Sequence, residues 1–101
     1  MLVLPAELTH DQASTCCRML AQAIRAEPGA EVLADVSALT RFDSSALAVL
    51  LECRRESMVV GKRFGVVGWP LKLRELAGLY GVAGLLSPEE GEPVAPARSA
   101  A

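Results

Sequence analysis

The chain has 101 residues, which is enough for one domain with a single core. Hydrophobic residues make up 51% of it and aromatic residues only 4%, so leucine, valine and alanine are expected to form the core. A net charge of −2 with scattered basic residues argues against nucleic-acid binding. The longest apolar run, residues 46–51, is far shorter than the roughly 20 residues that span a bilayer, so direct membrane insertion is not expected.

The cysteines and the first residues indicate the compartment. Glu7 and Asp11 lie near the start, and the basic region of a secretory signal is missing. Cys16 and Cys17 are adjacent and Cys53 is distant, a spacing that favours neither a disulfide framework nor a zinc site. We expect reduced thiols, no metal, no cofactor and a cytoplasmic protein.

The first third of the chain predicts a short strand, a helix and a longer strand. Residues 1–4 are apolar and predict an edge or truncated strand. Residues 9–12, T-H-D-Q, have the form of a capping box and open a helix that runs to about Ala26. Residues 31–36, E-V-L-A-D-V, have the composition of a buried central strand.

A second helix is expected to begin at Asp43 or Ser44 and to end at Gly61. If Asp43 is its N-cap, Phe42 and Leu47 occupy the positions of a hydrophobic staple. A serine or aspartate at this place has free helix amides beside it, so both candidates fit a capping role.

The remainder predicts a strand, a third helix and a tail. Residues 63–67 predict a strand, and Pro70 suits the first turn of a helix that ends at Gly81. The apolar stripe of that helix is expected to comprise Leu73, Leu76, Ala77 and Tyr80. Residues 1–86 then form the domain, and the proline-rich residues 87–101 form a disordered tail. The alternation predicts an α/β fold, in which helical crossovers favour parallel strands.

A search for catalytic chemistry finds no convincing constellation. The single histidine, His10, falls in the first turn of a helix and is more often solvated than catalytic at such a position. The tail glutamates are read as solvating charge, and the glycines do not form a phosphate-binding loop. We therefore expect a binding module and not an enzyme.

Two features carry competing interpretations. Asp43, Ser44 and Ser45 either cap the helix or present a serine for phosphorylation, where helix amides would stabilise the phosphate. Residues 46–51 are apolar nearly all round the helix, which fits core packing but also leaves room for an exposed docking patch. Trp69 is likewise either a core or rim residue or an interface anchor.

The segment A-D-V-S-A-L-T-R-F-D-S-S-A-L-A-V-L-L at residues 34–51 resembles the central motif of STAS domains. That motif has the form D-x-S, a short apolar connector, and D-S-S-G-L or D-T-G-G-L. The resemblance extends over about residues 1–86, through G-V-V-G at 65–68 and L-A-G-L-Y-G-V at 76–82. It implies a STAS-like small mixed sheet with helices packed on it.

Within this family the opening L-P-A-E-L-T-H and the ending L-A-G-L-Y-G-V-A-G-L-L are most similar to the MlaB type. That type is the STAS subunit of the bacterial ABC transporter that maintains outer-membrane lipid asymmetry. The resemblance implies a non-catalytic cytoplasmic subunit that binds the transporter ATPase and, through it, the permease. The alternative is an anti-sigma-factor antagonist that is switched by serine phosphorylation.

The resemblance assigns roles to the motif residues. Ser44 matches the Ser/Thr that is important in the transporter subunit, and Ser45 matches the serine phosphorylated in antagonists. The expected partner-binding residues are Asp43, Ser44, Ser45, Leu47, Leu51, Arg54 and Trp69. Self-association through such a patch is also possible.

Two departures from the family pattern matter. Ala46 and Ala48 stand where antagonists carry glycines, which would crowd a kinase approaching Ser45. The first strand is expected to be truncated or missing, which leaves the edge of the sheet less protected.

Overall fold

The computed structural model describes residues 1–87. Its elements in chain order are β1 (Leu2–Val3), β2 (Glu7–Leu8), α1 (His10–Ala26), β3 (Glu31–Asp35), β4 (Arg41–Phe42), α2 (Ser45–Val59), β5 (Arg63–Val67), α3 (Leu71–Leu79) and α4 (Ala83–Leu86). No helix among the described residues is long and apolar enough to cross a bilayer.

The central sheet has the strand order β1-β3-β5, and every pairing in it is parallel. Leu2 pairs with Ala34, and Ala34 in turn pairs with Val66, so β3 lies between the other two strands. A second, two-stranded ladder joins β2 to β4, also in parallel. This arrangement confirms the predicted α/β class and the parallel crossovers.

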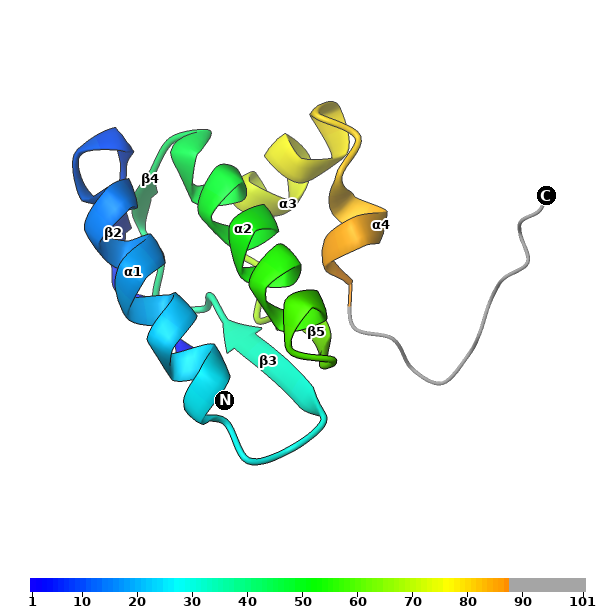
Figure 1. Ribbon diagram of the computed structural model, residues 1–101. Coiled ribbons are helices and arrows are strands. Elements are labelled where there is room, and N and C mark those ends of the chain that lie inside the picture. Colours follow the sequence, from blue (N-terminus) through cyan, green and yellow to red (C-terminus); the bar gives the residue numbers. More distant parts are fainter. Residues whose placement is uncertain (88–101) are drawn as a thin grey trace, which may run out of the picture.

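Helices α1 and α2 lie side by side in front of the strands (Figure 1). Each returns the chain from the carboxyl end of one strand to the start of a parallel strand, so the two helices run in the same direction. The alternating residues Val32, Ala34 and Val36 are all fully buried. With Ile24 of α1 and Leu50 of α2 they belong to one continuous hydrophobic core.

Most of the predicted helices and strands are confirmed. The differences concern the length of the first strand, the end of α3 and three short elements that were not predicted. The first strand is present but only two residues long. Tyr80, predicted on the apolar stripe of α3, is 56% exposed because α3 ends at Leu79 and the chain turns at Gly81, whose φ is 74°. Strands β2 and β4 and helix α4 were not predicted from the sequence. The predicted tail lies outside the described residues, apart from Ser87.

The D-x-S motif forms a tight turn at the carboxyl end of β3. The Asp35 side chain accepts a hydrogen bond from the Ser37 amide at 2.9 Å, which lowers the pKa of this carboxyl group. Gly68, which follows β5, lies against this turn with a φ of 76°. A Cβ at position 68 would lie 2.7 Å from the Asp35 Oδ1 atom. Glycine is therefore required here for both its backbone conformation and its size.

We predict that Gly68→Ala lowers the free energy of unfolding by about 2 kcal/mol or more, because a left-handed backbone and a clash with Asp35 act together. Urea denaturation measures the change. Gly78→Ala is the matched control, since Gly78 lies in α3 with nothing within 4 Å of the added Cβ. It should stabilise the helix by about 0.5–1 kcal/mol. Equal effects of the two substitutions would contradict the assigned role of Gly68.

Candidate functional site

The carboxylate of Asp43 joins the N-termini of the two large helices. Its Oδ1 atom accepts a hydrogen bond from the Ser45 amide at 2.8 Å, and its Oδ2 atom accepts one from the His10 amide at 3.0 Å. Ser44 precedes the first residue of α2, but its side chain forms no cap bond there. Of the two candidate caps for α2, Asp43 therefore performs this function, and it also accepts the first amide of α1, whose N-cap is Thr9 in the predicted capping box.

These two hydrogen bonds hold the negative charge of Asp43 at the N-termini of α1 and α2, where helix dipoles favour an anion. Because α1 and α2 are parallel, their positive dipole ends lie together, and the carboxylate faces both. The pKa of Asp43 is lowered, first by the His10 amide, then by the Ser45 amide, with smaller contributions from the Ser45 side chain and from the charge of His10. The group is ionised at neutral pH.

We predict that Asp43→Ala destabilises the protein at neutral pH and that this difference disappears in acid. The carboxyl pKa is lower in the folded than in the unfolded chain, where it is about 3.9. Its stabilisation is therefore complete above that pH and is lost as the pH falls through the lower, folded value. Urea midpoints of the wild type and variant across the acid range measure this.

The control for Asp43→Ala is Glu75→Ala, which removes an exposed carboxylate from α3. The Glu75 side chain forms no hydrogen bond or ion pair with any other part of residues 1–87, so little change is expected. If Asp43→Ala follows the pH profile of this control, the two amide bonds do not contribute to stability as described.

The two serines of the motif differ in exposure. Ser44 is exposed, and its hydroxyl forms no hydrogen bond within residues 1–87, whereas its carbonyl accepts the Leu47 amide at 3.1 Å. Ser45 is half-buried beside the Asp43 carboxylate. The serine that the resemblance links to the transporter subunit is therefore the more accessible of the two.

Ser44 begins a surface stripe along α2, which we call the α2 stripe. It comprises Ser44, Ala48, Leu51 and Arg55, at helical spacings of four, three and four residues. Leu51 is half-buried and the other three residues are exposed. The sequence analysis did not include Ala48 and Arg55 among the site residues, although stepping from Ser44 at these spacings would have found both.

The apolar residues around the start of α2 are mostly packed in the core. Leu47 is only 2% exposed, so its predicted direct contact with a partner is corrected to a packing role. Ala46 and Val49 are also buried, because α2 contacts α1, β5 and α4 at once. The expected exposed remnant of this apolar surface is reduced to Ala48 and part of Leu51.

We predict that Leu47→Asp costs at least about 3 kcal/mol of stability, since it removes a core side chain and buries a charge. Circular dichroism and urea denaturation should show a largely unfolded variant. Ala48→Asp is the neighbouring control with the same new charge, and it should retain the fold within about 1 kcal/mol. Equal loss of structure in both variants would refute the assignment of the two faces of α2.

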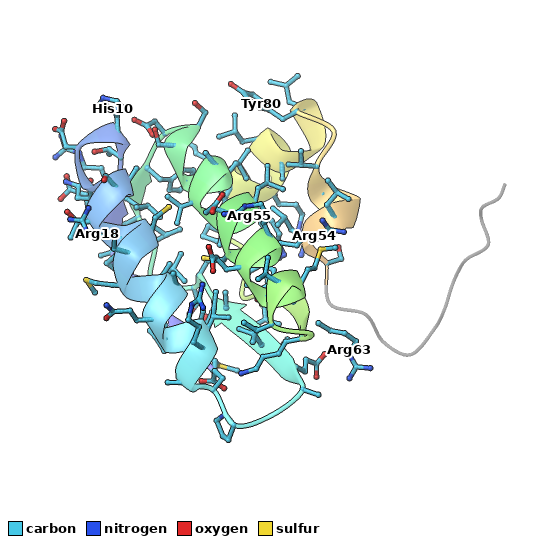
Figure 2. All side chains as sticks on the ribbon, viewed as in Figure 1. His10, Arg18, Arg54, Arg55, Arg63 and Tyr80 are labelled. Atoms are coloured by element: carbon cyan, nitrogen blue, oxygen red, sulfur yellow. The ribbon has the colours of Figure 1, made fainter. Side chains whose placement is uncertain are left out.

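Arg54 and Trp69 lie apart from the α2 stripe. Arg54 is half-buried on the flank of α2 that faces α4 (Figure 2). Trp69, also half-buried, lines a cavity of about 340 Å³ together with Arg74, Ala77, Ala83 and Ser87. The structure therefore brings Asp43, Ser44 and Ser45 together at the start of α2, where the α2 stripe begins. Trp69 lines a cavity that is separate from this stripe.

The thiols are poorly suited to nucleophilic chemistry. Burial raises the pKa of Cys16 and Cys17, and it raises that of Cys53 to about 12. All three are therefore protonated at neutral pH, whereas the thiolate is the reactive form. Among residues 1–87, no three histidine, cysteine or acidic side chains gather as metal ligands would.

Comparison with protein families identifies the fold. A family model described as "Mlab, STAS domain" matches residues 1–87, and the chain therefore belongs to the STAS domain family. Within that family it is of the MlaB type, as the sequence resemblance predicted. A comparison with curated proteins found no match.

Proposed function

We propose that this chain is the non-catalytic STAS subunit of an ABC phospholipid transporter that maintains outer-membrane lipid asymmetry. It binds the ATPase subunit on the cytoplasmic side of the inner membrane, and through that subunit the permease, and it supports their assembly and activity. The MlaB-type family match favours this role. We place the docking site on the α2 stripe because it is a surface of mostly exposed residues that begins at Ser44.

The α2 stripe suits a protein partner for three reasons. Ser44 and Ala48 are small, so the backbone of a partner can approach the helix closely. Leu51 offers apolar area, and Arg55 is held in place by bonds to Glu52 and Glu56, the latter at 3.3 Å. Side chains that are already ordered lose less conformational entropy on binding.

The alternative, an anti-sigma-factor antagonist, would require phosphate on Ser45. The Ser45 amide binds the Asp43 carboxylate, whose lowered pKa keeps it charged. A phosphate at this position would add about −2 next to that negative charge and within a half-buried site. This repulsion favours the transporter role over the phosphorylation switch.

Ser44→Arg tests the proposed docking site. We expect the variant to fold normally and to bind the ATPase subunit at least roughly tenfold more weakly, because a long charged side chain blocks close approach. Copurification and titration with the ATPase measure the loss. Ser14→Arg, which makes the same change at an exposed position of α1, is the control and should bind like the wild type.

Two results would contradict the proposal. Wild-type affinity of Ser44→Arg would place the docking site elsewhere on the chain. Isolation of the chain from its native cells with a histidine-kinase-like anti-sigma factor, and with phosphate on Ser45, would establish the antagonist role instead. Mass spectrometry of the isolated complex distinguishes these outcomes.

A further inference from the structure

The charges of the chain are unevenly distributed between its two parts. Residues 1–87 contain nine Lys and Arg and nine Asp and Glu side chains. The net charge of −2 therefore comes from the residues that follow, which contain Glu89, Glu90, Glu92 and Arg98. The three glutamates stand within five residues of Ser87, the last residue described.

A cationic groove lies next to Ser87. It has a volume of about 190 Å³ and runs between the C-terminal half of α2, the start of β5 and α4. Three basic side chains and several apolar ones form its walls, and no acidic side chain of residues 1–87 does. The lining residues are Arg54, Met58, Lys62, Arg63, Phe64, Gly84, Leu85 and Ser87.

In the described part of the chain, the cations of this groove lack the close carboxylate partners that Arg25, Arg41 and Arg55 have, although Glu31 is the register partner of Arg63 on β3. Arg25 pairs with Glu56 at 2.9 Å, for example. Within residues 1–87, Arg54 and Arg63 form no ion pair. The Lys62 ammonium group donates to the carbonyl of Ile24 at 2.8 Å at the C-terminal end of α1, and within residues 1–87 it has no carboxylate partner. Figure 2 shows Arg54 between α2 and α4, and Arg63 below the C-terminal end of α2.

We propose that the acidic segment Glu89–Glu92 of this chain docks on the cationic groove and pairs with Arg54 and Arg63. Ser87 itself lines the groove, and Glu89 and Glu90 follow two and three residues later. An extended chain covers at most about 3.3–3.6 Å per residue, so these carboxylates can reach roughly 7–11 Å from Ser87. The charges are complementary, and no separate molecule has to be recruited.

Each proposed ion pair between the acidic segment and the groove is weak. Its formation is favoured because the segment and the groove belong to the same chain. A single exposed ion pair contributes about 0–1 kcal/mol, and salt screens it. A short connection between two binding elements gives an effective concentration in the range of about 1 mM or more, which compensates for weak pairing. The segment would also occupy Arg54, so it would compete with any acidic partner element there. That last consequence alone rests on the proposed function.

The test uses the full chain and NMR. Replacing the three glutamates together (Glu89→Gln, Glu90→Gln, Glu92→Gln) should shift the Nε–Hε resonances of Arg54 and Arg63. In the wild type the amides of residues 89–92 should show positive heteronuclear NOE values, and these should be lost in the double variant Arg54→Gln/Arg63→Gln. They should also be lost at about 1 M salt, where the Debye length is about 3 Å.

The double variant Arg18→Gln/Lys72→Gln is the control, because it removes the same charge from exposed positions on α1 and α3. It should leave the NOE values unchanged. The proposal fails if this control lowers them equally, or if the glutamate replacements leave both arginine resonances in place. It also fails if phosphatidylglycerol vesicles shift the groove resonances while the glutamate replacements do not, since a lipid surface is then the occupant. None of these results depends on the transporter subunits.

Discussion

The arrangement of α1 and α2 depends on compensating two parallel helix dipoles. Parallel neighbours place like partial charges together at both ends, which is unfavourable without counter-charges. Asp43 supplies a negative charge at the shared N-terminal end and bonds to both helices. Lys62 supplies a positive charge at the opposite end, where its ammonium group reaches the carbonyls of Ile24 and Glu27. The Arg25–Glu56 pair connects the helices between these two points.

This compensation explains how the same short motif can stabilise the fold and still leave one of its residues exposed. Asp43 is occupied by two backbone amides, so the adjacent Ser44 is held at a fixed position on the surface without being needed for the fold. One helical turn further, Leu47 is in the core while Ala48 faces outward. A family motif of this kind therefore combines a structural acid with an adjacent residue that is available for contact, and its residues differ in their roles despite being consecutive.

The sequence predicted the elements whose signals are local, but not those that depend on distant residues. The strands at 31–36 and 63–67 and the two long helices were found from composition and caps. The ladder of β2 and β4 has two residues in each strand, too few for any periodicity, and it forms only through pairing. The fully apolar start of α2 suggested a docking patch, whereas three neighbouring elements bury most of it. The motif residues were found, but the bond from Asp43 to His10 spans 33 positions and has no sequence signal.

The segment from β3 to β5, which contains β4 and α2, has a consequence for the order of folding. Five residues of β3 pair with β5 at a separation of 32 positions, whereas β1 pairs only two residues with β3 at the same separation, and the Asp43–His10 bond spans 33. Because loop closure costs about the same entropy for these contacts, we expect the segment that gains the most strand pairs for that cost to form the nucleus. Asp43 would then hold the Ser45 amide within this segment before it gains the His10 amide, so its φ-value for folding should be intermediate. The bond to the His10 amide would mainly slow unfolding, because it forms after the transition state.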